Sequence, residues 1–337
     1  MHKIMKCIMT LTLLLTGCIN KTESANKKIK IGISYYDSYD SFVVGLSKRI
    51  ENELGTYENV VVKSYDAEKS QFTQNRQVSD MIDEGFDVIC VNLVDRTAPK
   101  KIISMAEDND VPIIFFNREL VSQDLESWTK LYYVGGYASE SGEKEGKLTS
   151  DYIHEHPEAD KNQDGKIQYV VLEGESGHQD AIVRTDVSVQ TITNEGIVLD
   201  KVDFAIANWN KSQAYTKTKQ MITEYDDQIE LLLSNNDDMA LGAIQAYQES
   251  GMERSEWPII VGIDGIITGL EAVKDGYLIG TIYNDQVSQA KSIAELSYAL
   301  ATNSSLSSLG LTNGKYIRHP YITVTKENVD DYLKLLQ

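Results

Sequence analysis

The sequence is poor in cysteine, proline and basic residues, and it lacks a long hydrophobic segment. Three cysteines and five prolines occur in 337 residues, so neither a dense disulfide framework nor a proline-rich linker can be built. Acidic residues outnumber basic residues by 51 to 32, which disfavours contact with a phosphate backbone and excludes nucleic acid as an expected partner. With 42% hydrophobic residues the chain can still bury a large core, and its length allows one large or two medium domains.

The N-terminus carries the pattern of a secretory signal. Two lysines precede the apolar run 8–15, which is far shorter than the ~20 residues needed to cross a bilayer. The run ends in Leu15-Thr16-Gly17-Cys18, which resembles a bacterial lipobox, so we expect cleavage before Cys18 and lipid attachment to its thiol. An ordinary cleaved signal followed by a chance cysteine is the alternative interpretation.

The lipobox fixes the expected N-terminal organisation and location of the mature chain. Residues 1–17 are then a lipoprotein signal peptide, residues 18–28 are the lipid anchor and tether, and the protein is extracytoplasmic, anchored to the outer face of the cell membrane. Removing the signal takes away two lysines and no acidic residue, which leaves 30 basic and 51 acidic residues and a formal charge of −21. Cys7 leaves with the signal and Cys18 is lipidated, so only Cys90 remains and no disulfide is expected.

From residue 30 onward, short apolar runs alternate with amphipathic stretches, which predicts βαβ units and parallel sheets. Strands are expected at 30–35, 60–65, 86–93, 112–116, 132–135, 167–173, 199–204, 229–234, 259–264 and 279–284. Helices are expected at 42–54, 71–84, 140–156, 180–194, 212–225, 237–248 and 266–274. These strands are too many for one open sheet of ordinary size, so the expected fold class is α/β with two doubly wound parallel-sheet lobes.

No proline- or glycine-rich segment separates the two series of strands, so we expect the chain to pass between the lobes more than once, through a hinge of several crossovers. The N-terminal lobe is predicted to contain residues 29–112 and 286–318. The C-terminal lobe is predicted to contain residues 113–285 and 319–337. A hinged pair of lobes closes around a ligand held in the cleft between them.

Polar side chains cluster where the predicted strands end, which is where ligands bind in open α/β sheets. The segments at these strand ends are Tyr36 to Phe42, Asn92 to Asp95, Gly177 to Asp180 with Arg184 one turn later, Asn235 to Asp237, Asp264, and Asn284-Asp285. Carboxylates accept hydrogen bonds, the guanidinium donates them and amides do both, so this set matches the hydroxyl groups of a buried sugar. Taken singly, Asn236 also fits a helix cap and Asp264 a turn, but several strand ends of this kind together favour a binding site.

Two aromatic residues complete the predicted binding site. The faces of a pyranose ring are apolar patches of C–H groups, which pack best on flat aromatic side chains. Phe42 and Trp209 are placed to provide such surfaces. For Trp209, an amphipathic surface position is the alternative.

The segment 160–168 has the spacing of an EF-hand calcium loop. Its oxygen ligands at positions 1, 3, 5, 7 and 9 are Asp160, Asn162, Asp164, the backbone carbonyl of Lys166, and Gln168. Gly165 at position 6 permits the tight turn, but position 12 is Val171 instead of a bidentate glutamate. Glu230 supplies the missing carboxylate if its strand lies beside the strand that begins at Ile167. A solvated acidic turn without a metal ion is the alternative.

Along nearly all of its mature length, the sequence resembles the periplasmic glucose/galactose-binding proteins of bacterial ABC sugar uptake systems. The resemblance rests on Lys30-Ile31-Gly32, Val91-Asn92-Leu93-Val94-Asp95, Val111-Pro112-Ile113-Ile114-Phe115-Phe116-Asn117, Tyr132-Tyr133-Val134-Gly135, Gly177-His178-Gln179-Asp180, Asn235-Asn236-Asp237 and Pro320-Tyr321. It implies a type I periplasmic-binding-protein fold and a sugar stacked between Phe42 and Trp209. It also implies a calcium loop completed by Glu230. The hydrogen bonds to the sugar that it implies come from Asp40, Asn92, His178, Asp180, Arg184, Asn236, Asp264 and Asn284.

Three positions depart from the family pattern. Lys166 occupies the seventh loop position, where only the backbone carbonyl is a ligand, and Gln179 stands where the family has proline. Glu119-Leu120 follow Phe116-Asn117-Arg118, so the preferences of the hinge can differ. The lipid anchor is a further departure, and it suggests a cell with a single membrane, from which a soluble receptor would be lost.

The resemblance implies a monomeric binding protein that takes up D-glucose or D-galactose and passes it to an ABC permease with its ATPase. A sugar-sensing subunit for a membrane histidine kinase or chemoreceptor, or a site for another monosaccharide such as xylose, is the alternative. An enzyme is disfavoured because no nucleophile elbow or phosphate loop accompanies His178, Asp180 and Arg184. The sensor domain of a repressor is disfavoured because a signal peptide stands where the DNA-binding headpiece would be.

Overall fold

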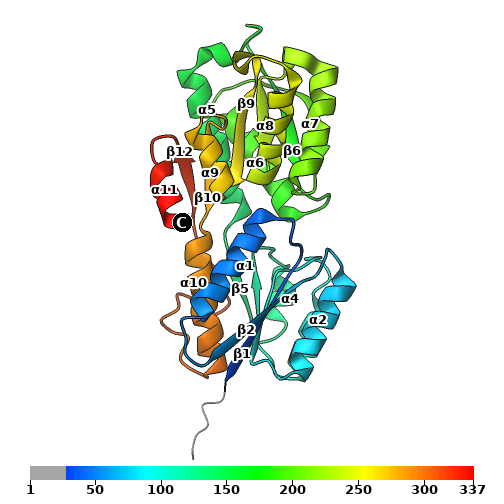
Figure 1. The fold of residues 1–337 in the computed structure, drawn as a ribbon, viewed down its shortest axis with the longest axis vertical. Helices are drawn as coiled ribbons and strands as arrows, with labels where there is room; N and C mark the ends of the chain where they lie inside the picture. Colours follow the sequence, from blue (N-terminus) through cyan, green and yellow to red (C-terminus); the bar gives the residue numbers. More distant parts are fainter. Residues whose placement is uncertain (1–27) are drawn as a thin grey trace, which may run out of the picture.

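The computed structural model describes residues 28–337, which form two α/β lobes arranged along the long axis of the molecule (Figure 1). The N-terminal lobe contains β1 (Ile29–Tyr35), α1 (Ser41–Leu54), β2 (Val60–Asp66), α2 (Gln71–Asp83), β3 (Val88–Val91), α3 (Lys100–Asp108), β4 (Ile113–Phe116), α4 (Ser122–Glu126), β5 (Leu131–Gly135), α10 (Gln286–Ala301) and β11 (Tyr316–Arg318). The predicted signal peptide and Cys18 lie outside the described residues, as does the tether apart from Lys28.

The C-terminal lobe repeats the same architecture. It contains α5 (Ala138–Glu155), β6 (Ile167–Glu173), α6 (Gln179–Asn194), β7 (Leu199–Ile206), α7 (Lys211–Tyr225), β8 (Leu231–Ser234), α8 (Asp237–Ser250), β9 (Ile259–Asp264), α9 (Ile267–Lys274), β10 (Gly280–Asn284), β12 (Tyr321–Thr325) and α11 (Val329–Leu336). All the strands and helices expected from the sequence are present with small shifts of their ends. Helices α3, α4, α10 and α11 and strands β11 and β12 are additional.

Each lobe is built on one six-stranded sheet. The strand order is β11-β5-β4-β3-β1-β2 in the N-terminal lobe and β12-β10-β9-β8-β6-β7 in the C-terminal lobe. All neighbouring strands are parallel except β12, which runs antiparallel to β10. The α/β class with two doubly wound lobes is therefore confirmed, and the carboxyl ends of the strands of both sheets face the junction of the lobes.

The predicted lobe boundary at 112/113 is wrong. Strand β4 pairs with β3, and β5 pairs with β4, so residues 113–135 belong to the N-terminal sheet. The first crossover therefore lies at Gly136 and Tyr137. The error has a physical cause: a βα unit of either lobe has the same hydrophobic pattern, and only long-range strand pairing decides which sheet it joins.

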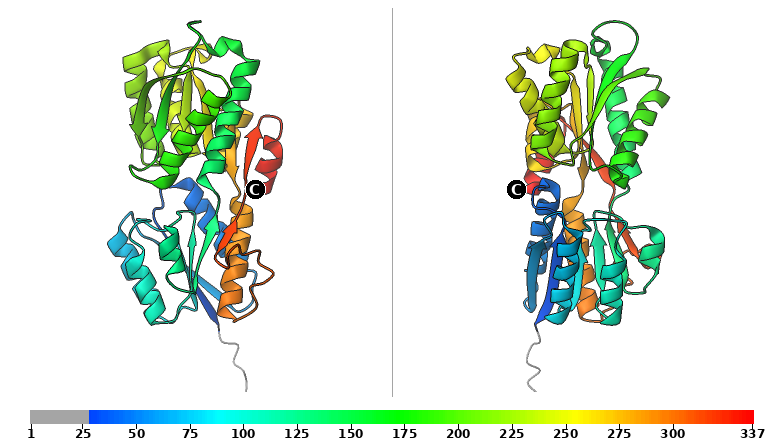
Figure 2. Two further views of the ribbon diagram at one scale, coloured as in Figure 1. Left: turned by 180° about the vertical axis from the view of Figure 1, so that it is seen from behind. Right: turned by 90° about the vertical axis from the view of Figure 1, so that its right-hand side faces the viewer.

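Three segments connect the lobes, after β5, after β10 and between β11 and β12 (Figure 2). Two of them touch each other, because the His319 N–H donates to the Gly135 carbonyl at 2.9 Å. Glu119, one of the positions that depart from the family pattern, forms an ion pair with Arg318, and Arg318 also donates to the Gly136 carbonyl at 2.9 Å. These contacts tie the first and third connecting segments together at the hinge.

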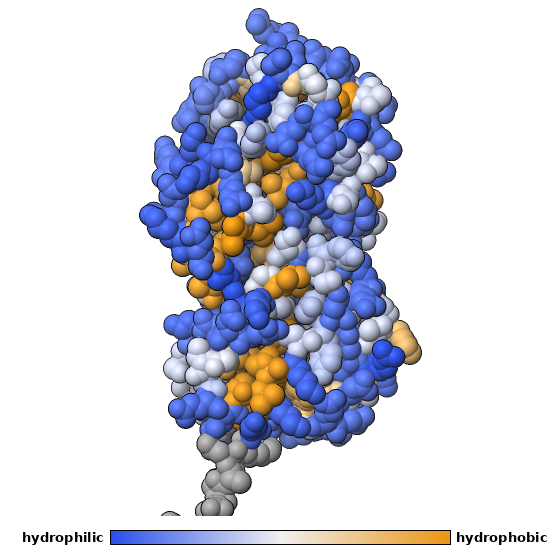
Figure 3. All heavy atoms as spheres, viewed as in Figure 1, coloured by the Kyte–Doolittle hydropathy of each residue, from blue (hydrophilic) through white to orange (hydrophobic). Residues whose placement is uncertain are grey.

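The core of each lobe consists of the apolar strands and the helix faces packed on them. Strands β3, β4 and β8 are buried along their whole length, as expected of parallel strands covered by helices on both faces. The outer surface is mostly hydrophilic, with apolar patches near the junction of the lobes and on the N-terminal lobe (Figure 3). Within residues 28–337, no helix is both long and apolar enough to cross a membrane.

Candidate functional site

A narrow cavity lies between the lobes, beyond the carboxyl ends of the strands. Eight of the ten predicted binding residues line it, namely Asp40, Phe42, His178, Asp180, Arg184, Trp209, Asn236 and Asp264. Asn117 and Arg118, which were not predicted, complete the lining.

The lobes contact each other directly beside this cavity. The Ser41 N–H and hydroxyl donate to the two carboxylate oxygens of Asp238, each at 3.0 Å. Arg118 forms an ion pair with Glu175 of the other lobe at 3.0 Å. The structure is therefore a closed arrangement in which residues of both lobes face the same space.

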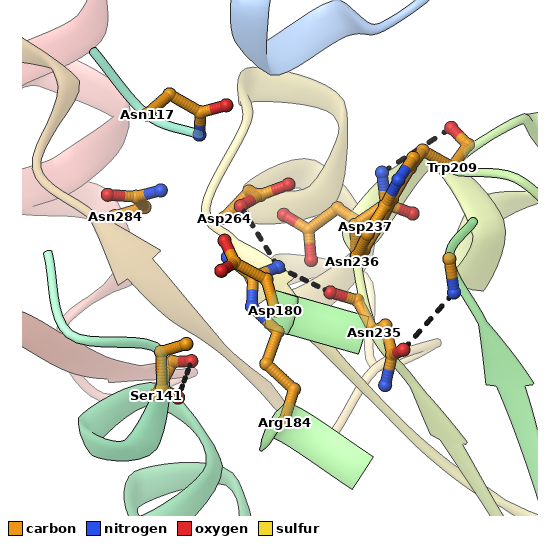
Figure 4. Close-up of polar contacts among 12 residues, drawn as sticks. Asn117, Ser141, Asp180, Arg184, Trp209, Asn235, Asn236, Asp237, Asp264 and Asn284 are labelled. Atoms are coloured by element: carbon orange, nitrogen blue, oxygen red, sulfur yellow. Dashed lines mark hydrogen bonds and ion pairs between the residues drawn. The ribbon is translucent and has the colours of Figure 1, made fainter. Parts of the chain in front are cut away.

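Arg184 is held rigidly on the C-terminal side of the cavity. Its Nη1 donates to the Asn235 carbonyl at 2.6 Å and lies 3.7 Å from the Asp264 carboxylate (Figure 4). Its Nη2 donates to the Tyr321 hydroxyl at 3.3 Å. Nε is buried without a hydrogen-bond partner among the described residues, so this N–H is free to bind a ligand oxygen.

The aspartates near Arg184 are buried acceptors. Burial raises the pKa of Asp264 well above its ordinary value, and Arg184 opposes the shift. Burial also raises the pKa of Asp180, again opposed by Arg184. Figure 4 shows both carboxyl groups close to the Arg184 guanidinium, on the same side of the site as Asn236. Because carboxyl groups this deep lack water, a ligand hydroxyl that donates to them replaces a lost hydration partner.

His178 is a neutral hydrogen-bond donor toward the cavity. It caps α6, and its Nδ1 accepts from the Asp180 N–H at 3.1 Å. Burial, with a contribution from Arg118, lowers the pKa of His178 to about 3, so the ring is uncharged at neutral pH. An accepting Nδ1 places the proton on Nε2, which is buried and has no partner in the described part of the chain.

Trp209 packs against both Gly174 and His178. A Cβ atom on Gly174 would come within 2.1 Å of the indole ring, so only glycine permits this close approach. The His178 ring meets the indole edge to face, with centroids 5.2 Å apart. Trp209 itself has φ 61°, and only 6% of its surface is exposed. The predicted stacking surface is therefore preorganised, and the surface-residue alternative for Trp209 is wrong.

The N-terminal lobe contributes Asp40 and Phe42 from the start of α1. Asp40 is the N-cap of α1, where Oδ1 accepts from the Val43 N–H at 3.0 Å. Its Oδ2 accepts from the Tyr36 hydroxyl at 2.7 Å. Burial raises the pKa of Asp40, while the Val43 and Tyr36 donors lower it. Phe42 is buried and lies in the same cavity lining, opposite the lobe that carries Trp209.

Asn92 and Asn284 were predicted to bind the sugar, but neither lines the cavity. Asn92 is fully buried; its Nδ2 donates to the Asn117 side chain at 3.0 Å, and its Oδ1 accepts from the Tyr36 N–H at 3.3 Å. Asn284 accepts from Gln289 at 2.6 Å. In this closed arrangement Asn92 positions Asn117 instead of facing the cavity itself. Asn117 directly follows β4, so the strand-end rule applied to that strand would have found it.

The lining provides hydrogen-bond partners and flat surfaces. Among the described residues that line the cavity, none is a serine, threonine, cysteine or lysine, so no side chain of these common nucleophile types is present. Three aspartates face two arginines, and two amides and a neutral imidazole complete the polar set. This arrangement can bind a small, neutral, polyhydroxylated molecule on all sides.

The predicted calcium loop and Glu230 come together at the far end of the C-terminal lobe. Glu230 Oε1 accepts from the Lys161 N–H at 2.6 Å, and Oε2 accepts from the Gln168 N–H at 3.0 Å. Strand β8 pairs with β6, which is the adjacency that the sequence analysis required. Asp160 folds over the loop by accepting from the Gly165 N–H at 2.9 Å, and Gly165 has φ 80°, as the tight turn at position 6 demands.

The donor set of this loop fits a hard cation such as calcium, because every side-chain ligand is an oxygen. It mixes three carboxylates with two amides and a backbone carbonyl. In the part of the chain that the structure describes, no group of three or more His, Cys, Asp or Glu side chains is arranged to hold a metal ion. The Glu230 oxygens face backbone N–H groups here, so calcium binding stays a prediction.

Comparison with known proteins extends these observations. The periplasmic binding protein domain model matches residues 31–305. The D-galactose/methyl-galactoside binding periplasmic protein MglB of Haemophilus influenzae is 33% identical over 308 residues, which cover 90% of this chain and 92% of that protein. A xylitol-binding protein of Mycolicibacterium smegmatis is 30% identical over 334 residues, which cover 94% of this chain and 83% of that protein. A solved ABC transporter solute binding protein from Bacillus halodurans with bound myo-inositol has a TM-score of 0.78 at 26% identity, covering 92% of this chain and 98% of that one.

Proposed function

Because this chain belongs to the periplasmic binding protein domain family, we propose that it binds D-glucose or D-galactose between its lobes and delivers the sugar to an ABC transporter. The chain is a solute-binding protein and not an enzyme. The sugar is the ligand of the interlobe cavity. Its contacts with both lobes stabilise the closed arrangement relative to the open one, which is the general way in which a ligand shifts such an equilibrium.

One observation carries the proposal: the cavity lining combines an aromatic side chain from each lobe with hydrogen-bond donors and acceptors from both lobes. Phe42 and Trp209 suit the two apolar faces of a pyranose, while Asp40, His178, Asp180, Arg184, Asn236 and Asp264 suit its hydroxyl groups. The excess of carboxylates over guanidinium groups disfavours an anionic sugar acid or sugar phosphate. A neutral hexose therefore fits best.

The relatives support a polyhydroxylated ligand but bind different ones. The Haemophilus influenzae relative is a galactose-binding protein by name, whereas the Mycolicibacterium smegmatis relative binds xylitol. We assign a hexopyranose because the Haemophilus influenzae relative is a galactose-binding protein by name, and we place Asp40, which lines the cavity from the N-terminal lobe, as an acceptor for one of its hydroxyl groups. Asp40 would then read the C4 hydroxyl, whose orientation distinguishes glucose from galactose. Xylose is the alternative ligand.

We further propose that Cys18 carries a lipid that holds the protein on the outer face of the cell membrane, as its lipobox-like surroundings predict. The partner is then an ABC permease with its ATPase, which would recognise the lobe tips when closure brings them together. A membrane sensor kinase or chemoreceptor that reads the same closed form is the alternative partner. Cells that keep this protein but lack the permease distinguish the two partners. Their sugar uptake is lost if the protein serves the permease, and it is unchanged if the protein serves only a sensor.

A titration of the mature chain, residues 19–337, with glucose, galactose, xylose and ribose tests the proposed ligand. We expect saturable binding of glucose or galactose, seen as binding heat and as a change in Trp209 fluorescence, and much weaker binding of ribose. A response to xylose or ribose alone would keep the cleft as the binding site but overturn the hexose assignment. No response to any of the four sugars would overturn the proposal.

Calcium is proposed as a structural ion of the C-terminal lobe, held by Asp160, Asn162, Asp164, Gln168, Glu230 and the Lys166 carbonyl. These residues lie around the loop that precedes β6, whereas the sugar-binding residues follow β6, β8 and β9 at their other ends. An ion at the opposite end of these strands from the cavity stabilises the fold of the lobe and makes no direct contact with the ligand. Calcium at about 100 times its dissociation constant adds about 2.7 kcal/mol to the free energy of unfolding.

Removing calcium is therefore expected to lower the melting temperature by about 5–10 °C and to change sugar affinity by less than about threefold. Melting curves and sugar titrations before and after treatment with a chelator measure both quantities. Glu230→Gln should melt early and respond little to the chelator, whereas Glu158→Gln, a change at an exposed glutamate outside the ligand set, should behave like the unaltered protein. A melting temperature unaffected by thorough chelation would argue against the calcium site.

A further inference from the structure

Arg118 is a buried arginine in the cavity lining. It is not among the residues proposed above to contact the sugar. It follows β4 in a tight turn, in which its N–H donates to the Phe116 carbonyl at 2.8 Å. Its guanidinium carbon lies 3.5 Å from the centre of the Tyr36 ring, and its Nη1 donates to the Val94 carbonyl at 2.9 Å. Only 3% of the residue is exposed. The side chain is therefore fixed by stacking and by a hydrogen bond within its own lobe.

One end of this guanidinium is left without a partner. Nη2 is buried and has no hydrogen-bond partner among residues 28–337, although Arg118 lines the cavity. A guanidinium N–H can only donate, so its partner must be an acceptor oxygen. A buried donor without an acceptor destabilises the state that contains it, and a charged donor does so more strongly. The closed arrangement thus contains a donor that a ligand oxygen would satisfy.

The other end of the guanidinium reaches across the cleft. Nη1 is 3.0 Å from the Glu175 carboxylate, and Glu175 lies in the loop between β6 and α6 of the C-terminal lobe. The same loop carries His178, which caps α6 and lines the cavity. The ion pair is largely screened from water, because the Arg118 and Glu175 side chains are 4% and 26% exposed. It exists only while the lobes are together.

Arg118 is also connected to the carboxylate proposed to read the sugar. Tyr36 stacks on the guanidinium with its ring and donates from its hydroxyl to Asp40 at 2.7 Å. Tyr36 therefore holds Arg118 and Asp40 in a fixed position relative to each other. The Asp40 carboxylate can accept from a sugar hydroxyl, and the Arg118 guanidinium can donate to a neighbouring oxygen on the same edge of the sugar ring.

We propose that Arg118 is both a ligand contact and the latch between the lobes: its Nη2 donates to a sugar oxygen while its Nη1 holds Glu175. This inference rests on the proposed function, because the oxygen belongs to the sugar in the cavity. It adds to that function a residue that couples binding to closure. Without a ligand the unsatisfied Nη2 opposes closure, and with a ligand the ion pair and the new hydrogen bond act together.

The first test compares Arg118→Met with Glu175→Gln in the mature chain, residues 19–337. Arg118→Met keeps the length of the side chain but loses both interactions, so we expect hexose affinity to fall by about 10- to 100-fold. Glu175→Gln keeps the proposed sugar contact and weakens only the latch, so we expect a smaller loss of about 3- to 10-fold, chiefly as faster dissociation. Arg76→Met, at an exposed arginine of the same lobe that does not line the cavity, is the matched control and should bind normally.

A second measurement separates a sugar contact from a merely structural role. Monodeoxy analogues of the bound hexose are titrated into the unaltered protein and into Arg118→Met. If Arg118 donates to a hydroxyl oxygen, one deoxy position weakens binding to the unaltered protein by about tenfold or more but has little further effect in Arg118→Met. An equal loss for every analogue, or an Arg118→Met affinity within twofold of the unaltered protein, overturns the inference. Failure of the unaltered protein to bind any hexose instead overturns the proposed function, and the sugar-oxygen assignment with it.

Discussion

Replacing Asp40 with alanine is expected to lower the affinity for glucose and galactose by about 100-fold or more. Asp40 is a buried carboxylate that accepts from the Val43 N–H and the Tyr36 hydroxyl, and it faces the cavity from the N-terminal lobe. Its loss would remove the proposed hydrogen bond from a sugar hydroxyl to the carboxylate, and hydrogen bonds to charged groups are among the stronger kinds. It also leaves the Tyr36 hydroxyl without its acceptor, so the wall formed by Tyr36 and Arg118 loses its anchor.

The alanine variant also removes the N-cap of α1, which costs about 1 kcal/mol of stability, so a second variant is needed. Asp40→Asn keeps an oxygen for the Val43 N–H but turns the other carboxylate oxygen into a donor. We expect Asp40→Asn to melt near the temperature of the unaltered protein and still to bind hexose weakly. Calorimetric titration measures the affinity of both variants. Unchanged affinity in Asp40→Ala would make Asp40 only a helix cap and would sink the assignment.

The alternation of apolar and amphipathic segments was enough to predict the fold class and its strands. Runs such as 113–116 are buried on both faces in parallel sheets, and their unbroken apolar character is visible without coordinates. The assignment of each βα unit to a lobe was not predictable in this way. Strand β4 joins the N-terminal sheet through its pairing with β3, and this contact leaves no local signal in the sequence.

The elements that follow the second and third crossovers, α10 and β12, were missed for a related reason. Helix α10 buries Gln286, Gln289 and Ser297 together with apolar residues, because it packs in the N-terminal lobe on α1 and the sheet. A helix with polar residues on its buried face has a weak amphipathic pattern. Strand β12 follows Pro320 and pairs antiparallel with β10, so it falls outside the βα alternation that guided the prediction.

The candidate site was predictable to the level of strand ends but not of side-chain directions. Asp40, His178 and Asp264 follow strands and face the cavity, as the rule for open sheets demands. Asn92 also follows a strand, but its amide is used to hold Asn117 and the backbone around Tyr36. Which of two neighbouring amides faces a ligand depends on the hydrogen bonds of their surroundings, and residue type alone does not determine it.

The largest effect expected on the C-terminal side comes from the Trp209 ring. Trp209→Ala removes one of the two flat surfaces of the site, and we expect hexose affinity to fall by about 30- to 100-fold, in line with the loss of a buried tryptophan at a binding site. Gly174→Ala should produce much of the same loss without removing any atom. A methyl group at position 174 would lie 2.1 Å from Trp209 Cζ2, so the ring must leave its place.

A double variant shows whether both changes act through the same ring. If Gly174→Ala acts by displacing Trp209, the variant that carries both changes should bind no more weakly than Trp209→Ala, whereas independent effects would add. Trp209→Phe keeps a smaller flat surface, so it should retain more affinity than alanine while losing the ligand-dependent fluorescence change. Full affinity in Gly174→Ala would show that the ring can shift without cost, and the stacked sugar would then need another partner on this lobe. The indole packs against Gly174 and against the His178 ring, and these contacts restrict its movement, so we expect the two single variants to be weak binders and the double variant to match Trp209→Ala.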